Sequence, residues 1–301
     1  GDMTILGAEL QQITATGLTL GGANVTLITV NGVTAANSNN ISGTVTLDAT
    51  QDNATIAFAT GASTFNALTA NADDGVAVNV AITTDVGNLA LEGDADNAAD
   101  TAVTGDRVTF ADGVTVTAAG ALALDATTGK LVGGNGLTLN AQDGVNLNDD
   151  ISTTAGALVI DADTDGAVSN ANPDNITLAA GVTITAGSSL TLNATSGSVV
   201  SAGGVTLTAP DGLTLGADLT TTAATVINAD SNDDGTGVFT LNGGSTISTT
   251  NNILSITGSD MALGGTIDSG TAATTLLVSN GGTIDLGGVS GALDLSAAEL
   301  Q

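Results

Sequence analysis

The sequence predicts an all-β fold, a right-handed parallel β-helix (β-solenoid) that forms one domain over residues 1–301. Three observations support this prediction. Short segments alternate apolar and polar residues, as half-buried strands do. Gly, Asn or Asp stands in nearly every gap between these segments, where turns are expected. One long stretch of sequence recurs along the chain, which is the signature of a repeat architecture. Because the gaps are too short for crossover helices, βαβ folds are excluded.

The repeat is clearest in the middle of the chain. Residues 113–129 recur at 181–197, and residues 136–155 recur at 204–223, where 11 of 20 positions are identical. Weaker matches at slightly different offsets extend the repeat in both directions, from 73–91 to 142–160 and from 176–184 to 239–247. The expected units are 38–105, 106–173, 174–236 and 237–301. An antiparallel sandwich is the main alternative, but it gives no reason for so long a period.

Unit 106–173 contains nine apolar clusters, which we interpret as nine short strands. Their centres are Val108, Val114, Leu122, Leu131, Leu137, Val145, Ile151, Leu158 and Val168, and the next unit restarts at Ile176. Three strands per coil give coils that run over 108–131, 131–151 and 151–176. Coils of this size can bury a common core only when they are stacked. The whole chain would then hold roughly 13 coils in a rod of about 60 Å, at roughly 4.8 Å per coil.

This register predicts three columns of inward-facing side chains. The first column holds Val108, Leu131, Ile151 and Ile176. The second holds Val114, Leu137 and Leu158, and the third holds Leu122, Val145 and Val168. The core should be thin, because only 1% of the residues are aromatic.

The composition excludes several classes of function. The chain has 31 acidic residues against two basic ones, Arg107 and Lys130, and it has no His, Cys, Trp or Tyr. It therefore lacks an imidazole base, a thiol nucleophile and a His or Cys metal site. A nucleic-acid surface needs clustered Lys and Arg, so no nucleic-acid partner is expected. Without a run of about 18 apolar residues, no membrane insertion is expected either.

The strongest candidate for a site is an acidic turn. Asp161, Asp163 and Asp165 precede Gly166 in the Asp-x-Asp-x-Asp-Gly form of a calcium loop, in which alternate carboxylates face one hard cation. The register adds Asp143 from the neighbouring coil. The equivalent residues one unit earlier are Asp74, Glu92, Asp94 and Asp96, and one unit later Asp211, Asn228, Asp230, Asn232, Asp233 and Asp234. The cofactor expected from these turns is Ca²⁺, and the alternative is a solvated acidic turn.

Two further patterns resemble the residues of functional sites. The pairs Asp149–Asp150 and Asp233–Asp234 have the residue types of a glycosidase acid and base. No aromatic platform or basic side chain accompanies them, which favours plain surface turns. The Thr-x-Thr pairs at Thr115 and Thr183 recur once per unit rather than once per coil, so ordinary outward-facing strand positions are expected instead of an ice-binding face.

Glycine-led blocks such as Gly136-Leu-Thr-Leu, Gly144-Val-Asn-Leu, Gly204-Val-Thr-Leu and Gly212-Leu-Thr-Leu resemble the repeats of filamentous-haemagglutinin-type exoproteins and autotransporter passengers. The resemblance covers most of the chain. It implies a secreted bacterial cell-surface protein with a β-helical shaft, used in adhesion or in an extracellular layer.

The two ends of the chain carry related sequences. Residues 1–11 match residues 291–301 at five of 11 positions, including the whole of Ala-Glu-Leu-Gln. A head-to-tail array of subunits or of tandem copies is therefore expected, with strands after Gly1 and before Gln301 that accept one another.

The leading hypothesis for function is a non-catalytic structural segment of an extracellular fibre, filament or layer. An adhesin shaft that binds a host receptor or glycan is the alternative, and a polysaccharide-degrading β-helix enzyme is the third.

Overall fold

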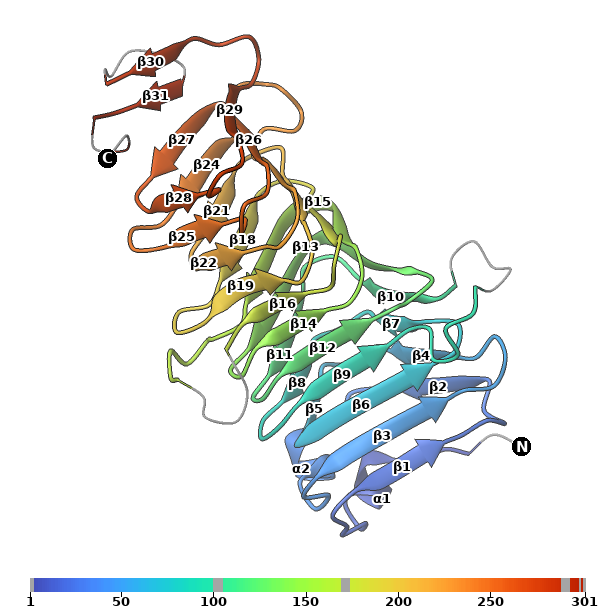
Figure 1. Ribbon diagram of the computed structural model, residues 1–301. Helices are drawn as coiled ribbons and strands as arrows, with labels where there is room; N and C mark the ends of the chain where they lie inside the picture. Colours follow the sequence, from blue (N-terminus) through green and yellow to red (C-terminus); the bar gives the residue numbers. More distant parts are fainter. Residues whose placement is uncertain (1–2, 100–104, 169–173, 288–292, 298, 300–301) are drawn as a thin grey trace.

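The computed structural model describes residues 3–99, 105–168, 174–287, 293–297 and 299. These residues wind into a rod of parallel strands with the two ends of the chain at its opposite ends (Figure 1). The strands form three ladders, which we call the first, second and third faces. Every pairing between neighbouring strands of a face is parallel. The predicted parallel β-helix with three strands per coil is therefore confirmed.

The first face is one sheet of eleven strands. Its members are β1 (Leu18–Gly21), β3 (Thr44–Ala49), β6 (Ala67–Ala72), β9 (Leu89–Glu92), β12 (Leu122–Asp125), β14 (Val145–Leu147), β16 (Ile176–Leu178), β19 (Ser198–Ser201), β22 (Asp218–Thr220), β25 (Thr246–Ser248) and β28 (Thr266–Asp268). The described part of the chain thus makes eleven coils along this face, where the sequence predicted roughly 13 for the whole chain. The rod is about 50 Å long at roughly 4.8 Å per coil.

The second and third faces belong to one sheet, because two long strands run through both. The second face holds β2 (Leu27–Val30), β4 (Thr55–Phe58), β7 (Val76–Val78), β10 (Arg107–Phe110), the first halves of β13 (Lys130–Ala141) and β15 (Ile151–Asp161), β17 (Thr183–Thr185), β20 (Thr206–Thr208), β23 (Thr225–Asn228), β26 (Leu254–Gly258) and β29 (Thr274–Val278). The third face holds β5 (Ser63–Phe65), β8 (Ile82–Thr84), β11 (Val114–Ala118), the second halves of β13 and β15, β18 (Leu190–Asn193), β21 (Leu213–Leu215), β24 (Val238–Leu241) and β27 (Asp260–Leu263).

Most of the predicted columns are present. Val108 pairs with Leu131 and Leu131 with Ile151 on the second face. The second predicted column, Val114, Leu137 and Leu158, is in register on the third face. On the first face, Leu122 pairs with Val145.

In two of the predicted columns, the last residue is placed wrongly. Ile176 pairs with Val145 on the first face, and Ile151 pairs with Ile184 instead. Val168 is 74% exposed and lies in no strand. The coil from Ile151 to Ile184 is therefore longer than its neighbours, because Val168, the expected centre of a ninth strand, lies outside any strand.

Loss of that strand changes how the sequence repeat maps onto the fold. From β10 to β16, which are repeat equivalents, the chain passes eight strand positions rather than nine. Eight strands are one short of three full coils. Each unit of the repeat therefore begins one face earlier than the unit before it, and repeat-equivalent residues do not stack on one another. Val114 lies on the third face, for example, whereas its equivalent Val182 leads into β17 of the second.

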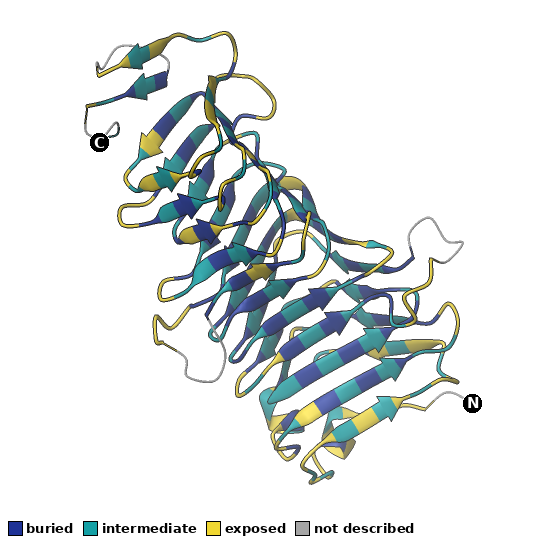
Figure 2. Cartoon of the chain, in the orientation of Figure 1, coloured by how far each residue is buried: buried dark blue, intermediate teal, exposed yellow. Residues whose placement is uncertain are grey.

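The core is a narrow column of aliphatic side chains that runs the length of the rod. Buried and half-buried residues alternate along most strands, so the ribbon is striped dark blue and teal (Figure 2). All four phenylalanines, Phe58, Phe65, Phe110 and Phe239, are buried in this column. The alternation is the expected consequence of one face of each strand meeting the core. No helix among the described residues is long and apolar enough to cross a membrane.

The ends differ from the shaft. Near the N-terminus, the short helices α1 (Gly7–Leu10) and α2 (Ala35–Ser38) precede β5, and α2 contacts it. Residues 7–10 are thus a helical turn, which corrects the strand expected after Gly1. Near the C-terminus, β30 (Ile284–Leu286) and β31 (Leu293–Leu295) form a separate parallel pair, and β31 contacts β27. Within the two matching end sequences, residues 1–2, 291–292, 298 and 300–301 lie outside the described residues.

Candidate metal centre at the acidic corners

The three predicted acidic turns lie at three different corners of the rod. The turn after β9 joins the first face to the second, and the turn after β15 joins the third face to the first. The turn after β23 joins the second face to the third. This arrangement follows from the eight-strand repeat, which moves each equivalent turn by one face. The candidate sites therefore form a spiral around the rod, not a column along it.

The first carboxylate or amide of each turn shapes the turn itself. Glu92, Asp161 and Asn228 each accept a hydrogen bond from the backbone N–H two residues later, at 3.0 to 3.2 Å. The exposed residues Asp96 and Asp165 do the same for the N–H groups of residues 98 and 167. Such local bonds are typical of Asx turns and compete with ligand binding for the same oxygens.

The second carboxylate of each turn is buried against the next coil. Asp94 is fully buried, and its Oδ2 accepts a hydrogen bond from the N–H of Thr128 at 2.6 Å. Asp163 is 2% exposed, and its Oδ2 accepts one from the N–H of Ser196 at 2.5 Å. The two contacts are repeat equivalents on different corners. Each carboxylate thus links its own turn to the turn of the following coil by a hydrogen bond.

At each of these two corners, a second buried carboxylate bonds to the same partner residue, Thr128 or Ser196. Asp106 Oδ2 accepts a hydrogen bond from the hydroxyl of Thr128 at 3.3 Å, and Asp174 Oδ2 accepts one from the hydroxyl of Ser196 at 2.9 Å. Asp106 and Asp174 are not among the predicted site residues. A signal was present, because they hold equivalent positions at the starts of consecutive repeat units and each stands just before a strand.

Two glycines allow this close approach. A Cβ at Gly129 would lie 1.5 Å from the carbonyl oxygen of Asp106, and a Cβ at Gly197 would lie 2.1 Å from that of Asp174. Both distances are far below van der Waals contact. The glycines after Thr128 and Ser196 are therefore required by the packing of these corners.

The predicted contact between neighbouring turns is present at Asp143. Asn140 pairs with Asp161, and the N–H of Thr164 bonds to the carbonyl of Ala141 at 3.0 Å, so the two turns are adjacent as expected. Even so, the carboxylates do not gather. No three Asp, Glu, His or Cys side chains in the described ranges are placed to hold one metal ion. Calcium binding at these turns stays a prediction.

Asp74 lies close to the newly found carboxylate of its corner. Burial and then the charge of Asp106 raise the pKa of Asp74 above its usual value. Burial likewise raises the pKa of the neighbouring turn residue Glu92 to about 7. The corner after β9 is thus rich in carboxyl groups that are partly withdrawn from water.

The third corner is different. Asp230 is 2% exposed, and its carboxylate accepts bonds from the N–H groups of Asp234 and Gly235 and from the hydroxyl of Ser279. Asp234 is exposed and bonds to Thr236, which lowers its pKa, and Asp211 is exposed. The turn itself and Ser279, which follows β29, thus supply donors to both oxygens of Asp230. Calcium binding at this third turn stays a prediction that these contacts do not favour.

Both carboxylates of the pair Asp149–Asp150 accept hydrogen bonds from backbone N–H groups of other coils. Asp149 Oδ2 accepts a hydrogen bond from the N–H of Ala126 at 2.6 Å, and Asp150 accepts one from the N–H of Thr183 at 2.8 Å. Asp150 also lies 3.9 Å from the ammonium group of Lys130.

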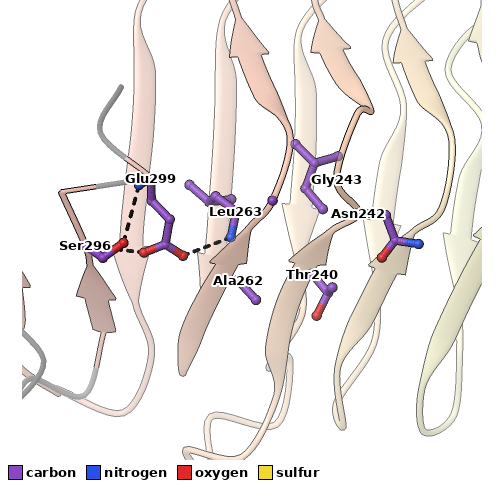
Figure 3. A pocket seen from close by; sticks show the side chains of 9 residues that line it. Thr240, Asn242, Gly243, Ala262, Leu263, Ser296 and Glu299 are labelled. Atoms are coloured by element: carbon purple, nitrogen blue, oxygen red, sulfur yellow. Dashed lines mark hydrogen bonds between the residues drawn. The ribbon is translucent and has the colours of Figure 1, made fainter.

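A surface hollow near the C-terminal end contains one further carboxylate, Glu299 (Figure 3). Its two oxygens accept hydrogen bonds from the N–H groups of Leu263 at 3.0 Å and Ser296 at 2.8 Å. The described residues that line the hollow therefore offer no acid and base in pairing distance, and its carboxylate is a structural acceptor.

Comparison with known proteins returned no matching family model, no matching curated protein and no matching solved structure.

Proposed function

We propose that this chain is a non-catalytic structural segment of a secreted bacterial cell-surface fibre or layer, in which β-helical rods stack end to end. The observation that carries the proposal is the unbroken ladder of the first face. From β1 to β28, each of its strands pairs in parallel with the next. A shaft of this kind holds its two ends at a fixed distance, which is what a fibre component needs.

The ends of the rod support stacking. The strands β1 and β28 each have a neighbour on only one side within the first face, so one row of backbone groups is open to a further strand. Exposed apolar side chains are found near both ends, namely Met3, Leu6 and Leu27 at one and Leu277, Ile284 and Leu286 at the other. The flanks carry most of a formal charge of −29, which opposes sideways association.

The related end sequences also share a local structure. Glu9 Oε2 accepts a hydrogen bond from the N–H of Leu6 at 2.8 Å, and Glu299 Oε2 accepts one from the N–H of Ser296 at 2.8 Å. The two bonds hold matching positions in the two end sequences. Glu299 bonds in addition to Leu263 of β27, on the coil beneath it (Figure 3). In the proposed assembly, the turn at Glu9 lies in the same way on the end of another rod or of a tandem copy.

Sedimentation velocity over a wide range of protein concentration tests the proposal. The protein should form linear oligomers that grow with concentration. Leu27→Asp and Leu286→Asp place a charge at either end on exposed residues, and each should prevent growth while leaving the rod folded. Val226→Asp is the matched control, because Val226 is 44% exposed on the flank. If Val226→Asp prevents association as well as the end variants, or if the unmodified protein stays monomeric, the stacking proposal is wrong.

A further inference from the structure

Two corners of the rod bring a pair of buried carboxylates onto one residue. At Thr128 the pair is Asp94 and Asp106, which are 0% and 5% exposed. At Ser196 the pair is Asp163 and Asp174, which are 2% and 4% exposed. In each pair one carboxylate accepts the backbone N–H and the other accepts the hydroxyl. Because both contacts end on one residue, the two carboxylates of a pair are close neighbours.

One oxygen in each pair has no hydrogen-bond donor among the residues that the structure describes. The Oδ1 atoms of Asp94 and Asp163 are buried and accept no hydrogen bond from these residues, although Oδ2 of the same carboxylates does. A buried charged acceptor that has lost water and gained no donor is costly, and a like charge beside it adds to the cost. The chain has only two basic residues to neutralise 31 acidic ones, and Lys130 lies beside Asp150.

The third corner provides an internal comparison. Asp230 is the repeat equivalent of Asp94 and Asp163, but Gly237 stands where the second carboxylate would be, in the register that aligns Phe239 with Ile176. There both oxygens of the buried carboxylate accept hydrogen bonds from the chain itself. An oxygen without a donor therefore occurs where a second carboxylate is present, and not where it is absent.

We propose that each of the two carboxylate pairs, Asp94 with Asp106 and Asp163 with Asp174, binds one divalent cation of the calcium type. Calcium takes oxygen ligands from carboxylates, hydroxyl and carbonyl groups and water, with flexible geometry, and can complete its coordination with water where the protein supplies few ligands. Two carboxylates neutralise the charge of the ion, and the bound ion would use the Oδ1 atoms that lack donors. This inference goes beyond the proposed structural role and does not depend on stacking.

Isothermal titration calorimetry with calcium chloride, on protein freed of metal by a chelator, tests the proposal. We expect two sites per chain and a rise in melting temperature on adding calcium, because an ion that binds only the folded state stabilises it. Asp163→Asn should remove one site, and Asp94→Asn with Asp163→Asn should remove both. The asparagine side chain still offers an oxygen to the N–H of Ser196 or Thr128, so the turns should stay folded. Asp230→Asn is the matched control and should keep both sites.

Two results would contradict this assignment. If calcium produces neither heat nor a change in melting temperature at neutral pH, the pairs do not bind the ion and the proposal is overturned. It is overturned equally if Asp230→Asn removes as much binding as the double variant. Calcium titration of the Asp174→Asn variant provides a second measurement, which should show one site instead of two. If both sites remain, Asp174 is not a ligand and the proposed pair is wrong.

Discussion

Asp149 lies between β14 and β15 at a corner where it is only half exposed. Burial, followed by the nearby charge of Asp125, raises its pKa to about 6, against the opposing effect of the N–H of Ala126. Asp149 therefore binds its proton more tightly in the folded state than in the unfolded state. The protonated side chain makes its full contribution to the free energy of unfolding below about pH 4, which is near the pKa of Asp149 in the unfolded chain. This contribution is lost as the pH rises through about 6.

Replacing Asp149 with Asn should remove this pH dependence. The amide resembles the protonated acid, so Asp149→Asn should melt higher than the unmodified protein at pH 8 and at a similar temperature at pH 4. The full shift would correspond to about 3 kcal/mol, and for a half-exposed group we expect on the order of 1 kcal/mol. Thermal melting from pH 4 to 8 with a chelator present measures the effect. If Asp149→Asn melts at a lower temperature than the unmodified protein at pH 8, this corner stabilises the ionised carboxylate and the prediction is wrong.

The candidate site was only partly predictable at the level of residues. The motif at Asp161 and the stacking of its turn on that of Asp143 followed from alternation and register, and the structure has both. The sequence could not show that Asp163 binds Ser196 in the next coil, because that contact depends on the length of the corner loop. Asp174 has a repeat equivalent in Asp106, but only the fold shows that both meet the partner of the turn carboxylate.

Strand β24 shows how a thin core makes each inward residue important. Phe239 is fully buried between Leu213 and Met261 of the adjoining coils, whereas the next residue, Thr240, points outward. Phe239→Ala should destabilise the protein by about 3–5 kcal/mol, because the few neighbouring side chains cannot close the cavity. Thr240→Ala is the control and should cost less than about 1 kcal/mol. Chemical denaturation measures both. Equal effects would mean that β24 does not have the orientation described here.

The prediction of the elements succeeded where alternation was regular and failed where a single apolar residue stood alone. Val114 and Leu137 each begin an alternating segment, and both are inward members of a column. Val168 has no alternating neighbour, and it lies in an exposed loop. Counting that residue as a strand gave nine strands per unit instead of eight. The error then placed Ile176 on the wrong face, since every strand position after a miscounted strand is displaced by one.

On the scale of the whole molecule, the eight-strand unit spreads equivalent features around the rod. A unit of nine strands would have placed every acidic turn on one edge. With eight strands, the turns after β9, β15 and β23 occupy one corner each. The charge of the repeat is therefore distributed over all sides of the shaft, which suits a rod that must avoid sideways aggregation.

The central claim is that this β-helix is a shaft that continues end to end. Electron microscopy of the purified protein at increasing concentration tests it most directly. We expect straight rods of about 50 Å and, at high concentration, filaments whose length grows in steps of that size and whose width stays constant. Single rods that never associate at any concentration, or compact particles without a long axis, would contradict the claim.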